Sequence, residues 1–132
     1  MSVGLDTSFV LRLLVGEPAD QARVALATLA DLRAKKIRPL VSDLVMAEAY
    51  FALQHHYGVP KSEALAALKE LIHGDEIDGM GVAGEILETP SLASAKPGFV
   101  DRLICRQYEK QAQETLTFER AGQRLPHVRV VK

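Results

Sequence analysis

Hydrophobic residues recur along this chain with two periods, and together they predict short strands separated by helices. The strand candidates are brief apolar stretches, whereas the helix candidates place apolar residues three and four positions apart. The predicted strands fall at residues 1–5, 37–41, within 76–82, and at 114–118 and 128–131. The predicted helices fall at residues 7–15, 19–36, 43–57, 60–74 and 99–111, with a short helix and loop at 83–93 and a helical turn at 119–125. Strands that alternate with helices indicate an α/β fold with a mainly parallel sheet, which binds ligands at the carboxyl ends of its strands.

Several residues at the element boundaries support this assignment. Ser42 is a natural N-cap for the helix that follows it, and Gly58 is a natural stop for the same helix. Pro18 suits the first turn of the helix at residues 19–36. Pro39 weakens the strand at 37–41, because a proline has no N–H to give to a sheet.

The helix after Ser42 contains a carboxylate where apolar residues are expected. Its apolar face is formed by Leu44, Val45, Phe51 and Ala52, and Glu48 lies in the middle of that face. We therefore expect Glu48 to point inward, toward a partner other than solvent. A salt bridge, or a side chain that reaches past the edge of the core, would also explain its position.

Three further acids occupy positions where they can meet Glu48. Asp6 directly follows the first predicted strand, Glu119 directly follows the strand at 114–118, and Asp101 lies in the first turn of a helix. The residues three, four and seven positions after Asp101 are Ile104, Cys105 and Tyr108, so we expect Asp101 to face the core side as well. In a compact α/β sheet, all four carboxylates can converge at one edge.

Each of these three acids also has an ordinary structural interpretation. Asp6 could be the N-cap of the next helix, and Asp101 could complement the dipole of its own helix. Glu119 could be a solvated turn residue.

A cluster of four carboxylates has a chemical requirement of its own. Ionised carboxylates repel one another, and burying an unpaired charge is costly, but a divalent cation that neutralises the group makes such a cluster tolerable. Oxygen ligands without cysteine suit a hard ion such as Mg²⁺ or Mn²⁺. Such ions bind phosphates and activate water for phosphodiester hydrolysis.

Composition restricts the class of protein. A chain of 132 residues is enough for one domain, residues 1–132, with one core. The net charge of -1 and the pI of about 6.4 give no global attraction for nucleic acid, so any such site must be a local patch. The single cysteine, Cys105, excludes an internal disulfide and a multi-cysteine metal site. The sequence has no apolar run long enough to span a membrane and no secretory signal, and we expect a cytoplasmic protein.

A local basic patch is present beside the acids. Arg102, Arg106 and Lys110 are spaced four residues apart on one predicted helix, and Arg120 and Arg124 lie near Glu119. Phosphates that approach an acidic metal site need flanking cations of this kind, so these residues are candidates for binding a nucleic-acid backbone. An ordinary solvated helix face is the alternative.

Three blocks of the sequence carry a family resemblance. They are "GLDTSFVLRLL", "VSDLVMAEAYFAL" and "GFVDRLICRQYEKQAQETLTFERAGQRLPHVRVV". In this order they resemble the blocks of a PIN domain, most closely the VapC-type toxins of bacterial and archaeal toxin–antitoxin pairs. Together they span almost the whole chain.

The resemblance assigns roles to five residues. It implies that Asp6, Glu48 and Asp101 bind the metal, that Thr117 is the polar residue before the fourth acid, and that Glu119 is that fourth acid. The family usually has aspartate at this last position. Glutamate keeps the charge but is longer by a methylene, so its reach and its angle toward a metal ion differ from those of aspartate.

The resemblance also implies a fold and an activity. The fold is a three-layer α/β/α sandwich with a four- to five-stranded mainly parallel sheet. The activity is that of a Mg²⁺- or Mn²⁺-dependent endoribonuclease acting on single-stranded RNA. The implied partners are a second copy of the chain, in a homodimer, and a small inhibitory antitoxin.

Two other functions are consistent with parts of the sequence. A phosphatase of the haloacid dehalogenase type also places an Asp after its first strand, but it needs a second Asp two residues later, where this chain has Ser8. A PIN-like module that binds RNA or a protein partner after losing its chemistry is the other alternative, and Glu119 is its support.

Overall fold

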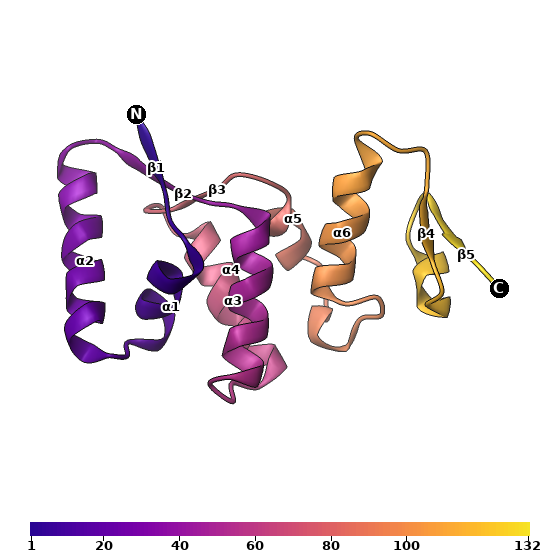
Figure 1. Ribbon diagram of the computed structural model, residues 1–132, viewed down its shortest axis with the longest axis horizontal. Helices are drawn as coiled ribbons and strands as arrows, with labels where there is room; N and C mark the ends of the chain where they lie inside the picture. The colour runs from indigo at the N-terminus through magenta and orange to yellow at the C-terminus, as the bar shows by residue number, and fades with distance from the viewer.

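The computed structural model describes residues 1–132 and has five short parallel strands in two separate sheets. The first sheet has the strand order β1-β2-β3, formed by β1 (Ser2–Gly4), β2 (Arg38–Val41) and β3 (Asp78–Gly79). The second sheet pairs β4 (Thr115–Thr117) with β5 (Val128–Val130). Figure 1 shows the two sheets on opposite sides of the molecule, with helices between them.

Six α-helices and two 3₁₀ turns connect the strands. The helices are α1 (Thr7–Val15), α2 (Ala19–Ala34), α3 (Asp43–His55), α4 (Lys61–His73), α5 (Ala83–Leu87) and α6 (Phe99–Glu109), and the 3₁₀ turns are η1 (Leu92–Ser94) and η2 (Arg120–Arg124). Helix α1 packs on α2 and α3, α3 packs on α4, and α5 packs on α4 and α6. The predicted order of strands and helices is thus confirmed. None of the helices combines the length and the apolarity needed to cross a bilayer.

Local sequence signals explain where the helices begin and end. The Ser42 hydroxyl accepts a hydrogen bond from the Val45 N–H at 3.2 Å, which confirms Ser42 as the N-cap of α3. Gly16 closes α1 with a φ of 77°, a left-handed conformation that glycine adopts without strain. Pro18 and Pro60 come directly before α2 and α4, where the absence of a proline N–H costs no helical hydrogen bond.

Pro39 is accommodated in the central strand because β3 is very short. The backbone N–H and C=O groups of successive β2 residues point alternately toward β1 and β3. The Arg38 N–H points toward β1, where it donates to the carbonyl of Met1. The missing N–H of Pro39 therefore faces the β3 side. Strand β3 pairs only with Leu40 and Val41, so no ladder bond is lost at Pro39.

The main core lies among the helices and the first sheet. Twenty buried residues form it, all but two of them from residues 5–92. Helix α3 contributes Met46, Ala49, Tyr50 and Leu53, which lie on a different face from the one predicted. The predicted apolar face of α3 is confirmed for Val45 and Ala52, which pack against this core, and is wrong for Leu44 and Phe51, which are exposed. Because the helix has apolar residues nearly all round, periodicity alone does not select the buried side.

The C-terminal part is almost excluded from this core. Phe99 and Leu103 of α6 are its only contributions, and among residues 104–132 only Gly122 is buried. The mixed α/β class with parallel strands is therefore confirmed, while a single sheet of four to five strands in a three-layer sandwich is not.

Candidate acidic site

Asp6 joins the first strand to the first helix. It is the N-cap of α1, and its Oδ1 accepts hydrogen bonds from the Phe9 N–H at 3.0 Å and from the Ser8 hydroxyl at 2.7 Å. The Phe9 N–H, and after it the Ser8 hydroxyl, holds the pKa of Asp6 below its ordinary value by stabilising the carboxylate. The second carboxylate oxygen makes no hydrogen bond within the chain, so it is available to a ligand.

Glu48 is hydrogen-bonded to Thr7, the residue that directly follows Asp6. The hydroxyl of Thr7 donates a hydrogen bond of 2.7 Å to Glu48 Oε1, which links the start of α1 to the middle of α3. Glu48 is exposed, together with Leu44 and Phe51 of the same helix, whose exposed fractions are 70% and 46%. The expectation that Glu48 points into the core is therefore wrong: it lies on a helix face that is apolar but uncovered.

Asp101, Thr117 and Glu119 form a second group in the C-terminal part. All three line one cavity of about 430 Å³ between α6 and the β4–β5 sheet. The Glu119 N–H donates to Thr117 Oγ1 at 3.0 Å, which fixes the turn that presents the glutamate. Gly122 makes this turn possible, because a Cβ there would lie 2.7 Å from Thr117 Cγ2.

Asp101 does not face the core. It is exposed, as are Ile104 and Tyr108 on the same side of α6, and it also borders a second cavity of about 360 Å³ against Phe51 and His55 of α3. The expectation of an inward Asp101 is wrong because α6 buries only the side that carries Phe99 and Leu103.

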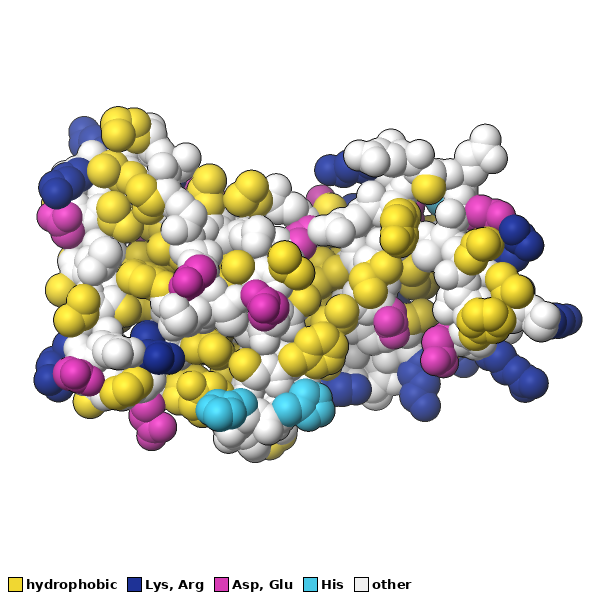
Figure 2. All heavy atoms as spheres, in the orientation of Figure 1, with side chains coloured by type: hydrophobic (Ala, Val, Ile, Leu, Met, Phe, Trp, Pro, Cys, Tyr) yellow, Lys and Arg dark blue, Asp and Glu magenta, His cyan; other side chains and the backbone are white.

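The four acids thus form two groups rather than one. Figure 2 shows acidic side chains in the middle of this face in two separate groups, one over α1 and α3 and one over α6 and β4, with hydrophobic side chains between them. The donor chemistry fits a hard cation, since every candidate ligand is an oxygen. The geometry of one chain does not, because no three acidic, histidine or cysteine side chains lie close enough to hold a metal ion.

The basic residues beside the acids are partly occupied by other contacts. Arg106 binds Glu85 of α5 at 2.8 Å, a hydrogen bond that raises the pKa of Arg106, and also approaches Glu109 at 3.6 Å. The Arg102 guanidinium donates to the Pro97 carbonyl at 2.7 Å. Lys110 and Arg120 are exposed and form no ion pair, so they are the cations of the set most available to a phosphate.

Arg124 is also engaged with the backbone. It donates a hydrogen bond of 3.3 Å to the Lys96 carbonyl, across from η2 to the loop before α6.

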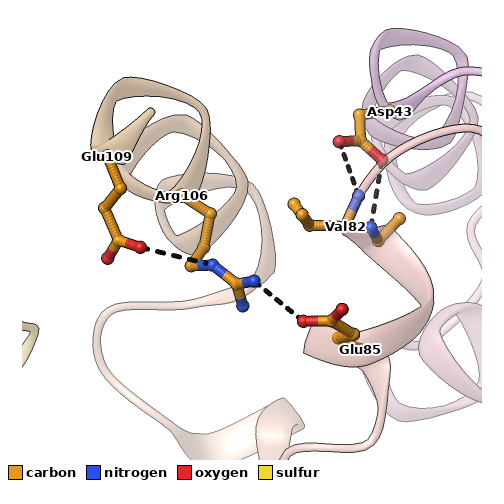
Figure 3. Close-up of polar contacts among 6 residues, drawn as sticks. Asp43, Val82, Glu85, Arg106 and Glu109 are labelled. Atoms are coloured by element: carbon orange, nitrogen blue, oxygen red, sulfur yellow. Dashed lines mark hydrogen bonds and ion pairs between the residues drawn. The ribbon is translucent and has the colours of Figure 1, made fainter. Parts of the chain in front are cut away.

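Two polar residues near the site were not identified from the sequence. Thr7 orients Glu48, and its position directly after Asp6 was the only available signal. Asp43 is the one buried carboxylate, and it accepts hydrogen bonds of 3.0 Å from the N–H groups of Val82 and Ala83 at the start of α5 (Figure 3). No local pattern links Asp43 to a segment 39 residues later, so this role could be seen only in the structure.

Comparisons with known proteins leave the family open. No family model matches the chain, and no curated protein or solved structure is significantly similar to it.

Proposed function

We propose that this protein is a PIN-like, metal-dependent endoribonuclease that cleaves single-stranded RNA and is the toxin of a toxin–antitoxin pair. The observation that carries the proposal is that four carboxylates without a basic partner come in two pairs, and that each pair is fixed by a threonine hydrogen bond, from Thr7 in the first turn of α1 and to Thr117 at the end of β4. Thr7 orients Glu48 next to Asp6, and Thr117 holds the turn of Glu119 next to Asp101. Structural ion pairing does not account for these four carboxylates, since none of them has a basic partner.

In the proposed active form, the two acidic groups lie together and the five strands belong to one sheet of a three-layer sandwich. The cofactor in this proposal is Mg²⁺ or Mn²⁺, which supplies charge for a phosphate and lowers the pKa of a bound water. Because one chain as folded here does not gather three ligands, we derive no reaction step through the ion.

The roles of the chain's own residues follow from their contacts. Ser8 and the Phe9 N–H hold one oxygen of Asp6 and leave the other free. Lys110 and Arg120 are exposed cations that can bind the RNA backbone on either side of the acids. The proposal includes a small antitoxin as inhibitory partner, a homodimer, and action in the cytoplasm, where the RNA substrate is found.

Cleavage of a short single-stranded RNA tests the proposal. We expect the wild type to cut it with Mn²⁺ and to stop with EDTA, whereas Glu48→Gln should lose at least about a hundredfold in rate, as is typical when one electrostatic group is removed from a site. Glu70→Gln, which removes an exposed acid of α4 with no ion pair, is the matched control and should leave the rate unchanged. Water attack predicts 5′-phosphate and 3′-hydroxyl ends; 2′,3′-cyclic phosphate ends formed without metal would contradict the proposal.

One observation favours a second candidate, a module that binds RNA or a partner without cleaving. No three acidic, histidine or cysteine side chains lie close enough to hold a metal ion, as is expected of a protein that binds RNA or a partner without metal-dependent cleavage. RNA binding by the wild type that is unaffected by Mn²⁺, together with no cleavage, would select this candidate.

A further inference from the structure

A series of aromatic rings leads from the core to the open cavity beside Asp101. The Phe99 ring, which is 1% exposed, meets the Tyr50 ring edge-on with centroids 5.2 Å apart. Tyr50 contacts Phe51, with centroids 5.6 Å apart, and Phe51 stacks beside His55, with centroids 6.1 Å apart and planes inclined by 25°. Phe51 and His55 are both exposed. The core thus holds two nearly parallel rings at the surface.

These rings form one wall of the cavity of about 360 Å³ between α3 and the start of α6. Its volume is within the range of small-ligand sites, about 300–1,000 Å³. The side-chain amide of Gln54 lies on the same wall, and its Nε2 donates a hydrogen bond of 3.2 Å to the Tyr50 carbonyl. An aromatic wall with an amide beside it suits a flat heterocycle, which can stack on the rings and hydrogen-bond at its edge.

Two lysines give the cavity a positive charge. They are Lys61, at the start of α4, and Lys96, in the loop before α6. Both are exposed, and neither forms an ion pair. The only acid of the lining is Asp101, so two ammonium groups and one carboxylate leave a net charge of +1. The cavity therefore attracts an anion to the edge of its aromatic wall.

The cavity adjoins the C-terminal acidic group. Lys96, Gly98 and Asp101 line both this cavity and the cavity of about 430 Å³ that Thr117 and Glu119 line. Figure 2 shows histidine side chains at the lower edge of this face, where α3 ends, with hydrophobic and basic side chains next to them. A ligand that extends from one cavity into the other passes Lys96 and Asp101 at the shared rim.

From the stacked rings, the unpaired lysines and the shared rim, we infer that this cavity binds one nucleotide of a single-stranded RNA. The base stacks on Phe51 and His55, and Lys61 and Lys96 bind the phosphates on either side of it. Aromatic stacking combined with a basic path for the backbone is the usual way in which proteins hold single strands. A duplex does not fit this site, because its bases are stacked on one another and do not reach the wall.

The choice of RNA, and the position of this nucleotide next to the bond that is cut, rest on the proposed function. Binding itself needs neither metal nor cleavage. Two unpaired lysines beside exposed rings favour a strand with regularly spaced negative charges over an apolar peptide segment. We call the cavity the base pocket.

Fluorescence anisotropy of a labelled six-nucleotide RNA in EDTA tests the base pocket without any activity. We expect Phe51→Leu to weaken binding about 5- to 150-fold, the range that corresponds to stacking of one base. Phe51→Tyr keeps the ring and should bind as the wild type does. Leu44→Ala, an exposed apolar residue of α3 outside the cavity, is the matched control and should also bind normally. Circular dichroism shows whether each variant is folded. Equal affinity of the wild type and Phe51→Leu, or a folded wild type that binds no RNA, overturns the inference.

Two further ligands identify what Phe51 recognises. An RNA analogue of the same length without bases should bind the wild type and Phe51→Leu equally, because it has no base to stack. An equal loss with the analogue and with the RNA would mean that Phe51 acts through the fold, and overturns the inference. Adenosine monophosphate should compete far more weakly than the unlabelled RNA; equal competition would assign the pocket to a free nucleotide and overturn the assignment to RNA.

The salt dependence of binding tests the two lysines. Each phosphate contact contributes about 0.7 to the slope of log affinity against log salt for a single strand. We expect Lys61→Gln and Lys96→Gln each to reduce this slope by about that amount. Lys69→Gln, an exposed lysine of α4 without an ion pair, is the matched control and should leave the slope unchanged. An unchanged slope in both pocket variants overturns the inference.

These measurements also separate the base pocket from the nuclease function. A wild type that binds RNA through Phe51 but never cleaves it contradicts the nuclease function and supports the pocket. A wild type that cleaves RNA, with Phe51→Leu binding and cleaving equally well, supports the function and overturns the pocket.

Discussion

At the scale of single residues, Asp6 serves the fold and the candidate site at once. One carboxylate oxygen caps α1, and the other makes no hydrogen bond within the chain. The ordinary interpretation of Asp6 as an N-cap is confirmed, and it does not exclude a role in binding.

The cap predicts a pH dependence. Because hydrogen bonds hold the pKa of Asp6 below its ordinary value in the folded chain, its contribution to the free energy of unfolding is present above the unfolded-state pKa and is lost as pH falls through the folded pKa. We expect Asp6→Ala to lower the free energy of unfolding by about 1 kcal/mol at pH 7, as for other N-caps, and by much less at pH 2. Urea unfolding at the two pH values measures this.

Ser8→Ala gives the matched comparison for the same site. It removes one donor to the carboxylate, so an NMR titration should show the pKa of Asp6 rising toward its ordinary value. An unchanged pKa in Ser8→Ala would show that the Ser8 hydroxyl does not stabilise the carboxylate.

Gly81 makes the buried position of Asp43 possible. A Cβ at Gly81 would lie 2.2 Å from one oxygen of Asp43 and 2.6 Å from the other, so the carboxylate must move away from Val82 and Ala83. We expect Gly81→Ala to reduce the free energy of unfolding by about 1–3 kcal/mol, the cost of leaving buried groups without hydrogen bonds. Thermal or urea unfolding measures the loss.

A double-mutant cycle isolates the cause at Gly81. In an Asp43→Ala background, there is no carboxylate to displace, so the added methyl group should cost much less. Equal losses in both backgrounds would assign the effect to the backbone of residue 81 itself.

At the scale of elements, local sequence signals are sufficient to predict the order and type of the helices and strands but not which side of a helix is buried. Caps and prolines placed α1, α3 and α4 within a residue or two of their observed ends, because a cap acts through neighbours in sequence. The predicted buried face of α3 is wrong at Leu44 and Phe51, since a helix that is apolar nearly all round takes its orientation from the elements that pack on it. The prediction for Asp101 is wrong for the same reason: α6 buries one narrow side, and Ile104 and Tyr108 on the side of Asp101 are exposed.

Helix α6 should show this division in its energetics. Phe99 is 1% exposed and packs in the core, whereas Phe118, just after β4, is 80% exposed. Phe99→Ala should lower the free energy of unfolding by about 3–5 kcal/mol, the usual cost of emptying a buried aromatic site. Phe118→Ala should change it by less than about 0.5 kcal/mol when measured at concentrations where the chain is monomeric. Equal losses would mean that the β4–β5 sheet is packed within the chain.

At the scale of the whole molecule, the sequence predicted which residues carry the candidate chemistry but not how they assemble. Asp6 and Glu48 are brought together by one threonine, and Asp101 and Glu119 by one cavity, and both pairings follow from elements that are close in the chain or in contact. How the two pairs are placed relative to each other depends on how α6 and β4 pack against the rest of the chain. Neither periodicity nor spacing distinguishes a strand that pairs within its own chain from one that pairs with a second copy, because both bury the same residues.

The charges of the two parts of the chain give the last prediction, which concerns the proposed homodimer. Residues 99–132 carry a net charge of +3, from seven Lys or Arg and four Asp or Glu, and residues 1–98 carry -4, from nine and thirteen. Attraction between the +3 and -4 parts is screened by salt, since the Debye length falls from about 14 Å at 0.05 M to about 4 Å at 0.5 M, whereas burial of apolar side chains, such as the exposed Leu116 and Phe118, is not weakened by salt. Sedimentation equilibrium at these two salt concentrations should therefore show the dissociation constant of the dimer rising, by roughly tenfold if the charges contribute 1–2 kcal/mol. In Arg129→Gln, which removes one positive charge of β5, the rise should be smaller. A dissociation constant that falls with salt would mean that apolar contacts alone hold the two copies together, and that the opposite charges of the two parts do not face each other.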